Sequence, residues 1–370
     1  MIRAAWRDVI FRRRRFAIAI VATALVFALS LLLSGVSASF AQEADRTVRD
    51  VGGDAWIVRD GSPGPFTSFV PIRAEWADQL TGGGVVAARA MLVAHQVVRR
   101  TNHAGRIESD SPFRDVTLFG VDPVGLGAPR VVDGHGIEGS SDAVVDRRLG
   151  YDLGDQFPLG SRVVTVVGRT RGATLFAGLA NVYVSLDTAQ AAFPGLGNTG
   201  LIANTIVVKG EISAPVTARE EGAPGPVTLK LLTLRDVRDD VLRPLEGAQR
   251  TIDLVRLLLW IVAGCIVASI IYVTALERTR DFAVFKATGT ATSHIFAGLV
   301  AQALLLAVGA GLASVVVAWG LSRVFPIPVA VPTSSYVLLA LLAVVVGVLA
   351  SLAGVRRVVS VDPATAFVGA

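Results

Sequence analysis

The chain has 370 residues, of which 52% are hydrophobic and only 18% are charged. A mean hydropathy of +0.58 is high for a soluble protein and indicates a membrane protein. The formal net charge of +5 is compatible with nucleic-acid binding. The clearest clusters of basic residues lie beside apolar runs, however, so lipid headgroups are favoured as their partners. The single cysteine, Cys265, falls inside an apolar run, so the polar part of the chain holds no internal disulfide.

Long apolar runs predict four transmembrane helices, because roughly 20 apolar residues in a helix bridge the hydrocarbon core with their backbone hydrogen bonds satisfied. The runs are about Phe16–Leu33, Leu257–Leu276, His294–Leu321 and Tyr336–Val355. The stretch between the first two runs, about Ala41–Arg250, has no segment long enough to span lipid. We therefore expect an α-helical membrane protein with four transmembrane helices and a mixed α/β extracytoplasmic domain between the first and the second.

Clusters of basic residues flank these runs and set the expected orientation. They are Arg12–Arg15 before the first run, Arg278, Arg280 and Lys286 between the second and third, and Arg356–Arg357 after the fourth. Four spans place all of these clusters on one face, which the positive-inside rule makes cytoplasmic. The loop on the opposite face, Val324–Ser335, has no Lys or Arg. Nearly all of the cations are Arg, which indicates a GC-rich bacterial genome. We therefore expect a multi-pass protein of a bacterial inner membrane with both termini in the cytoplasm.

The first apolar run has an alternative interpretation as a cleaved signal peptide, with Ser39-Phe40-Ala41 as the cleavage site. Its length, from Phe16 to Ala38, exceeds the usual apolar region of about 7–15 residues and favours a retained anchor. One helical face formed by Ile2, Trp6, Val9 and Ile10 predicts a short interfacial helix before it. The expected divisions are residues 1–40 for this helix and the first span, 41–250 for the extracytoplasmic domain with a stalk, and 251–370 for the other three spans.

Helical patterns border the polar stretch on both sides. Apolar residues step by three and four through Leu234, Val237, Val241, Leu245, Ala248, Ile252 and Val255, which predicts a helix rising into the second span. Pro244 interrupts this pattern, so the helix either kinks there or starts there with Pro in its first turn. A weaker pattern of Val36, Phe40, Thr47 and Val51 extends the first span. The two extensions either form a stalk, with residues Val241, Leu245, Ala248 and Ile252, or pack on the floor of the domain.

Runs of β-branched residues bounded by Gly and polar turns predict strands inside the domain. These runs are Asp54–Val58, Arg162–Gly168, Asn181–Ser185 and Leu201–Lys209. Ser140–Leu149 is predicted as a short helix that leads into a turn. The domain is therefore expected to mix strands with short helices.

The sequence shows no catalytic constellation. It has no Gly-Lys pair and so no P-loop for a nucleotide, and its scattered histidines favour surface or packing roles over metal ligation. The carboxylates of Asp142, Asp146, Asp152 and Asp155 lack calcium-loop spacing and are interpreted as solvated caps. Gly139–Ala143 lacks the closing glycine of a nucleophile elbow. We expect a non-catalytic chain with no metal or cofactor of its own.

The segment Arg278–Gly289 is too polar to continue the second span and too apolar for a solvent-exposed connecting loop. Phe282 and Phe285 are i, i+3 neighbours on a helix, flanked by basic residues, and the glycine permits a turn into the third span. Taken alone, this pattern favours a juxtamembrane segment that its aromatic and basic side chains anchor at the headgroups.

The same segment resembles a family motif. Arg280–Gly289 is similar to the Arg-Glu-Ile-Ala/Gly-x-Leu-Lys/Arg-Ala-x-Gly segment of FtsX-like (MacB-type) ABC transporter permeases. The ending Val361–Ala366 resembles their closing Asp-Pro-x-x-Ala element. Further stretches resemble their extracytoplasmic core, namely Asp152–Phe157, Val163–Gly168 and Val182–Leu186. The resemblance covers essentially the whole chain, including the layout of one span, a domain and three spans.

In this family the loop between the second and third spans is a coupling helix that docks on a separate cytoplasmic ATPase. The resemblance implies a coupling loop formed by Arg278, Arg280, Asp281, Phe282, Phe285, Lys286 and Gly289. Asp281 and Phe285 replace the usual Glu and aliphatic residue, which puts the docking contacts in doubt but not the general role. The family also implies a permease homodimer, ATPase subunits that hold ATP and Mg, and room for an extracytoplasmic adaptor.

We therefore expect a membrane permease subunit that couples ATP hydrolysis in a partner chain to export of a lipid-like or peptide cargo, or to mechanical work on the outer domain. Gly53–Val58 resembles the DevC-like branch, which is tied to lipid or glycolipid export. An alternative is a membrane-anchored sensor or scaffold whose extracytoplasmic domain binds a partner without an ATPase. A membrane-tethered hydrolase is a third alternative, which the missing constellation disfavours.

Overall fold

A computed structural model of the chain describes residues 13–80, 84–101, 112–193, 200–212, 216–218, 226–279, 281, 284, 291–324, 329 and 331–359. The described residues divide into two compact units. The helical unit contains the residues up to Ser39 and those from Gly247 onward, and the sheet unit is Phe40–Glu246. The predicted interfacial helix before the first span and the closing element Val361–Ala366 lie outside the described residues.

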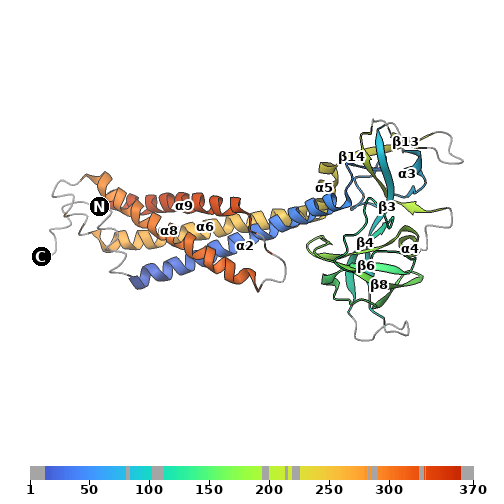
Figure 1. Cartoon of the computed structure of the whole chain (residues 1–370). Coiled ribbons are helices and arrows are strands. Elements are labelled where there is room, and N and C mark those ends of the chain that lie inside the picture. The colour runs from blue at the N-terminus through green and yellow to red at the C-terminus, as the bar shows by residue number, and fades with distance from the viewer. Residues whose placement is uncertain are drawn as a thin grey trace. The chain divides into compact units, whose positions relative to one another are not determined.

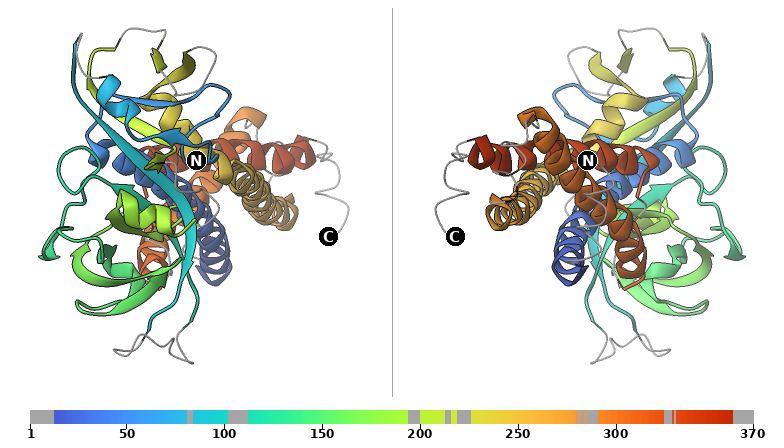
Figure 2. Two further views of the ribbon diagram at one scale, coloured as in Figure 1. Left: turned by 90° about the vertical axis from the view of Figure 1, so that its right-hand side faces the viewer. Right: turned by 90° about the vertical axis from the view of Figure 1, so that its left-hand side faces the viewer.

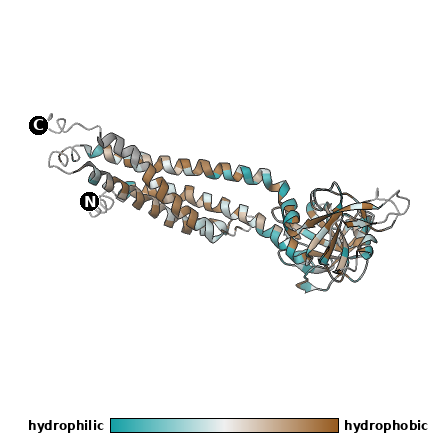
Figure 3. Cartoon of the chain, turned by 90° about the horizontal axis from the view of Figure 1, so that it is seen from above, coloured by the Kyte–Doolittle hydropathy of each residue, from teal (hydrophilic) through white to brown (hydrophobic). Residues whose placement is uncertain are grey.

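Long apolar helices build the helical unit (Figure 1). They are the first part of α2 (Arg13–Val51), α6 (Glu246–Glu277), α8 (Thr292–Ser322) and α9 (Thr333–Val359). Three stretches of the described chain are long and apolar enough to cross a membrane, namely Arg14–Val51, Leu234–Glu277 and Ala297–Ser322, and Thr333–Leu349 is a shorter apolar helix. Figure 3 shows hydrophobic residues along these helices. Helices able to span a membrane thus occur at the first three predicted runs, and the total of four spans stays a prediction.

Small and polar side chains let the helices of this unit pack closely. A side chain at Gly347 of α9 would meet the Ala303 carbonyl oxygen of α8 at 3.3 Å. The indole Nε1 of Trp260 on α6 donates a hydrogen bond to Ser30 Oγ on α2 at 2.9 Å. Close backbone approach and interhelical hydrogen bonds are the contacts that hold helices together where no hydrophobic driving force acts between them.

The sheet unit contains fourteen described strands, most of them short. They are β1 (Ala55–Arg59), β2 (Ile72–Arg73), β3 (Val85–Val98), β4 (Arg114–Val121), β5 (Asp133–Gly134), β6 (Asp142–Asp146), β7 (Gln156–Leu159), β8 (Arg162–Thr170), β9 (Thr174–Leu175), β10 (Leu179–Ser185), β11 (Ile202–Ala203), β12 (Thr205–Gly210), β13 (Val216–Ala218) and β14 (Val227–Thr233). Its helices are α3 (Trp76–Gln79), α4 (Leu186–Ala191), α5 (Leu234–Leu242) and two 3-10 turns, Arg147–Leu149 and Arg243–Leu245.

The described strands form a 12-stranded sheet in the order β13-β14-β1-β12-β3-β4-β10-β6-β8-β5, with β7 beside β8 and β9 beside β10, and a two-stranded sheet of β11 and β2. The long strand β3 joins the two halves of the large sheet (Figure 2). Its residues up to Met91 pair with β12, and those from Leu92 onward pair with β4, both antiparallel. In the second half β10 runs parallel to β4, and β6 runs parallel to β8.

The last turns of α2 pack on this sheet. Val48 and Val51 are buried in one core cluster with Trp56 and Phe119. The helix ends at Val51, and Gly52 follows with φ +79°, the left-handed conformation typical of a residue that closes a helix. The predicted extension of the first span is confirmed, and its outer end packs on the domain floor.

Three predicted strands are confirmed, as β1, β8 and β10. The fourth, Leu201–Lys209, is divided between β11 and β12. The side chain of Asn204 explains the division, because its amide nitrogen donates to the carbonyl oxygens of Pro65 (2.8 Å) and Val93 (3.0 Å). Its amide oxygen also accepts the Val93 N–H at 2.9 Å. Asn204, between the two strands, therefore forms hydrogen bonds with the backbone of a loop and of β3, and the strand is interrupted there.

The predicted short helix at Ser140–Leu149 is wrong over most of its length. Residues Asp142–Asp146 form strand β6, and only Arg147–Leu149 form a 3-10 turn. Ala143, Val144 and Val145 are completely buried, with β6 paired to β8 and β10 on its two sides. A β-branched run paired on both sides gains more as a central strand than as a surface helix.

Of the carboxylates predicted as caps, Asp142, Asp146 and Asp155 make local hydrogen bonds, whereas that of Asp152 bonds Arg169. Asp142 accepts the backbone N–H groups of Glu138 and Gly139, and Asp155 accepts that of Asp152. Asp146 also caps the 3-10 turn, through the N–H of Arg148. Asp146 is only 1% exposed, however, so the interpretation of a solvated carboxylate is wrong for this residue.

Candidate functional site

The predicted coupling loop follows α6. Of its residues, Arg278 and Asp281 are described, with Arg278 Nε at 3.4 Å from Asp281 Oδ2. Arg280, Phe282, Phe285, Lys286 and Gly289 lie outside the described residues. Immediately before the loop, Glu277, the last residue of α6, forms an ion pair with Arg15 of α2 at 2.7 Å. This pair brings the basic start of α2 and the end of α6, which Arg278 follows, to the same end of the helical unit.

The predicted stalk residues occupy three successive elements. Val241 lies in α5 and is buried, Leu245 ends the 3-10 turn Arg243–Leu245, and Ala248 and Ile252 lie in the first turns of α6. Pro244 is the middle residue of this 3-10 turn. The helical path is therefore interrupted at the proline and is not one regular helix from Leu234 to Val255.

The outer turns of α2 hold loops of the sheet unit through a set of charged contacts that the sequence did not predict. Glu43 accepts hydrogen bonds from the Thr174 hydroxyl (2.8 Å) and the Ala177 N–H (3.1 Å). Arg46 donates to the Gly172 carbonyl oxygen at 3.0 Å. Phe176 and Ala177, in the turn between β9 and β10, have φ of 48° and 68°, which side-chain-bearing residues rarely adopt. The contact from Glu43 thus stabilises a strained turn against α2.

Helix α5 joins this set from the other side. Arg238 Nε lies 2.7 Å from Asp45 Oδ1 of α2. The fully buried carboxylate of Asp240 accepts the Phe66 N–H at 2.8 Å and the Thr67 hydroxyl. We call Glu43, Asp45, Arg46, Arg238 and Asp240 the helix–sheet junction. The one sequence signal for it is the charged run that follows the apolar part of α2 while the helical pattern continues.

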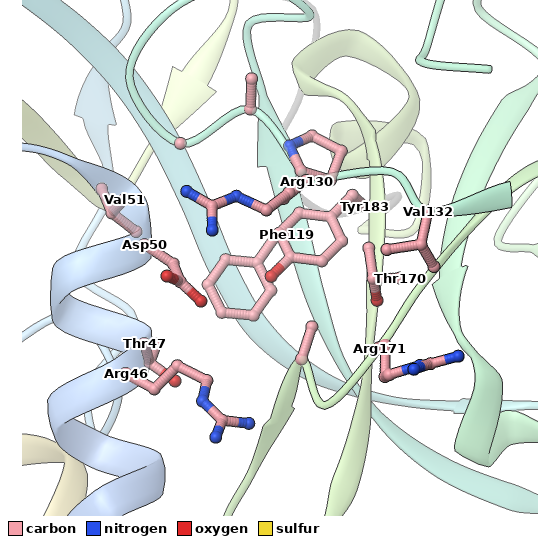
Figure 4. A pocket seen from close by; sticks show the side chains of 14 residues that line it. Arg46, Thr47, Asp50, Val51, Phe119, Arg130, Val132, Thr170, Arg171 and Tyr183 are labelled. Carbon is pink, nitrogen blue, oxygen red and sulfur yellow. The ribbon is translucent and has the colours of Figure 1, made fainter.

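A cavity of about 480 Å³ opens beside this junction (Figure 4). Its walls are the last turns of α2, the loop that contains Arg130, and the residues that follow β8. Phe119 of β4 and Tyr183 of β10 stack at its centre, with ring centroids 5.0 Å apart. Burial raises the pKa of the Tyr183 hydroxyl to about 12, against a hydrogen bond from Asn181 that lowers it. This hydroxyl is therefore protonated at neutral pH.

A second charged cluster lies on the surface around β5 and β8. Asp133 bonds Arg147 and lies 3.3 Å from Arg169, whose other nitrogen lies 2.8 Å from Asp152. The hydrogen bond from Arg147 holds the pKa of Asp133 below its usual value. The histidines His95 and His135 face the carboxylates of Asp115 and Glu138. Among the described residues, no group of three or more His, Cys, Asp or Glu side chains could hold a metal ion.

Comparison with known proteins gives matches along the whole chain. The family described as FtsX-like permease C-terminal matches residues 254–363. An uncharacterized ABC transporter permease of Mycobacterium tuberculosis strain H37Rv is 38% identical over 376 residues, which cover 100% of both chains. The macrolide export ATP-binding/permease protein MacB of Rhodopseudomonas palustris is 26% identical over 227 residues, or 56% of this chain and 34% of MacB.

Among solved structures, the periplasmic region of MacB from Actinobacillus actinomycetemcomitans covers 52% of this chain and 95% of its own, with 11% identity and a TM-score of 0.33. That score is too low to support an argument about the fold. The similarity over the full length is decisive, because it joins the helical unit and the sheet unit in one type of protein. Together with the matched C-terminal region, it places the chain in the family of FtsX-like ABC transporter permeases.

Proposed function

We propose that this permease couples ATP hydrolysis in a separate cytoplasmic ABC ATPase to export of a lipid-like or peptide cargo, or to mechanical work on the sheet unit. The observation that carries the proposal is the course of α2, a single helix of 39 residues. Its apolar turns belong to the helical unit, and its last turns are fixed in the sheet unit by Glu43 and Arg46. A helix whose residues belong to both units gives a cytoplasmic movement a continuous backbone along which to pass.

In this proposal the loop Arg278–Gly289 docks on the ATPase, which binds ATP and Mg because this sequence carries no P-loop. Four spans place both termini and this loop in the cytoplasm and the sheet unit outside. The permease acts as a homodimer with two ATPase subunits, and an adaptor binds the outer domain where one exists. A lipid or glycolipid cargo, from the DevC-like resemblance, belongs to the same proposal.

The double variant Phe282→Ala/Phe285→Ala tests the docking role. Removing two aromatic anchors from an interface typically weakens association by about 2 kcal/mol or more. We expect the variant to insert normally but to lose affinity for the ATPase and to lose coupling of hydrolysis to output. Association is measured by co-purification, and coupling by ATPase activity and transport in reconstituted vesicles.

The matched control is Phe113→Ala, which removes an exposed aromatic ring from the sheet unit and should leave association unchanged. Normal association and normal activity of the double variant would refute docking through this loop. A permease that functions fully with no ATPase would instead favour the membrane-anchored sensor or scaffold.

A further inference from the structure

The cavity beside the helix–sheet junction has the size and lining of a small-molecule site. Its volume of about 480 Å³ lies in the range of roughly 300–1,000 Å³ that ligand pockets occupy. The coupling proposal uses only Arg46 of its lining, and all of its walls belong to the sheet unit. Its residues therefore call for an explanation of their own.

Positive charge dominates the lining. Arg46, Arg130 and Arg171 contribute three cations, against the single carboxylate of Asp50. The side chains of Arg130 and Asp50 form no ion pair or hydrogen bond with any residue that the structure describes, whereas the Arg46 guanidinium donates to the Gly172 carbonyl oxygen. In Figure 4 the guanidinium groups of Arg46 and Arg130 lie on either side of Asp50, and that of Arg171 points away from the rings. Two planar guanidinium groups thus border the cavity, and that of Arg130 has no partner among the residues that the structure describes.

The centre of the cavity is aromatic and offers a hydrogen-bond donor. Phe119 is 1% exposed and supports the Tyr183 ring, which remains partly exposed. The Tyr183 hydroxyl accepts a hydrogen bond from Asn181 Nδ2 at 3.2 Å. A tyrosine hydroxyl is protonated at neutral pH, so its own hydrogen is available to an acceptor in the cavity. A planar guanidinium can bind an anionic group while a neighbouring aromatic ring contacts a flat apolar group joined to that anion.

We propose that this cavity binds an organic anion, a phosphate or carboxylate joined to an apolar or aromatic group. The anionic group contacts Arg46 and Arg130 and accepts a hydrogen bond from the Tyr183 hydroxyl. The apolar group covers the Tyr183 ring. A bare inorganic anion would leave the ring uncovered. A neutral apolar molecule would remove water from Arg130 without replacing its hydrogen bonds, which is unfavourable.

Calorimetric titration of the full-length protein in detergent micelles tests the site with three probes: phenyl phosphate, inorganic phosphate and phenol. We expect saturable binding of phenyl phosphate that is tighter than that of either other probe. Arg130→Gln should weaken phenyl phosphate binding by about tenfold or more, because it removes a charge-assisted hydrogen bond. Arg130 has no partner among the described residues, so this change should not disturb folding.

Arg114→Gln is the matched control, because Arg114 is an exposed arginine on the same strand as Phe119 but outside the cavity lining. It should leave the affinity unchanged, and Tyr183→Phe should weaken binding without abolishing it. No saturable binding by the unmodified protein, or equal affinity in Arg130→Gln, would overturn the proposal.

A second arm identifies the source of the anion. The titration is repeated in nanodiscs of phosphatidylcholine alone and of phosphatidylcholine with phosphatidylglycerol. Weaker phenyl phosphate binding in the presence of phosphatidylglycerol assigns the site to a lipid headgroup, and equal binding assigns it to a soluble anion. The experiment contains no ATPase, so its result is independent of the coupling proposal.

Discussion

Single residues at the helix–sheet junction carry interactions that can be removed one at a time. Asp240 is fully buried and is the acceptor for both the Phe66 N–H and the Thr67 hydroxyl. The backbone at Gly64 approaches this carboxylate so closely that a side chain there would collide with it. The loop before β2 therefore depends on α5 for its conformation.

Asp240→Ala should leave the partly buried Phe66 N–H and the Thr67 hydroxyl without this acceptor. An unsatisfied buried polar group costs about 1–3 kcal/mol. We expect hydrogen exchange on the full-length protein to show a loss of about 2 kcal/mol in the opening free energy of the Phe66 amide. Asp239→Ala is the control, because the neighbouring Asp239 side chain is 61% exposed. Equal protection of Phe66 in both variants would contradict a structural role for Asp240.

Asp236 makes the start of α5 sensitive to acid. Thr233 and Asp236 form a capping box, and the hydrogen bonds from the Thr233 hydroxyl and N–H hold the pKa of Asp236 below its usual value. A lowered folded-state pKa adds stability above the unfolded-state pKa of about 3.9, and this stability is lost as pH falls through the lower folded value.

Protection of the α5 amides, corrected for intrinsic exchange rates, should therefore fall as the pH drops below about 4. In Asp236→Asn this fall in protection should be absent to the extent that protonation of Asp236 causes it. Thr233→Ala should lower protection at neutral pH by about 1 kcal/mol, the usual value of an N-cap. An Asn variant with the same acid profile as the unmodified protein would assign the pH effect to other groups.

At the scale of elements, the sequence predicts those segments whose own pattern decides their structure. The strands β1, β8 and β10 have short β-branched runs between turn residues, and α2 continues for as long as its apolar pattern does. Val85–Val98 was not predicted as β3, because its alanines and its mixed spacing match neither helix nor strand. Its strand form depends on pairing with β12 and β4, which are distant in sequence.

The helix–sheet junction and the cavity were not predictable for the same reason. Glu43 meets Thr174 across 131 residues, and Arg238 meets Asp45 across 193 residues. No local pattern encodes such contacts, and only the helical extension of α2 was visible in the sequence. The interruption of the helix at Pro244 was predicted, but the 3-10 turn that forms there was not, because a proline marks an interruption without specifying its geometry.

A proline substitution tests transmission through α6 only if it lies beyond the first turn of that helix, which begins at Glu246. Ala248 lies in the first turn of α6, where proline is tolerated, whereas Ile252 lies in the interior. Ile252→Pro removes a helix hydrogen bond and clashes with the preceding turn, at about 3 kcal/mol. We expect this variant to bind its ATPase normally but to lose transport or mechanical output in reconstituted vesicles.

Ala248→Pro is the matched control and should keep most of its output. A proline at Ile252 that leaves the output intact would show that α6 does not need a regular helix to carry movement. Transmission through α6 would then be abandoned, and α2 would remain as the connecting element.

At the scale of the whole molecule, the sequence predicted the layout through its apolar runs and basic clusters. The ion pair between Arg15 and Glu277 supports one premise of that prediction, because it brings two basic clusters to one end of the helical unit. The family assignment rests on the full length of the chain. Partner, cargo and orientation depend on contacts beyond a single chain, which neither apolar periodicity nor the fold encodes.

The central claim, that the loop after α6 docks on an ATPase, is tested most directly by photo-crosslinking in membranes of the native host. A photo-reactive amino acid replaces Phe282, and a second variant carries it at Trp319, an exposed residue near the opposite end of α8. We predict that position 282 captures a cytoplasmic chain with a P-loop and that position 319 does not. Capture of lipid alone at position 282, with no ATPase in the crosslinked product, would contradict the account.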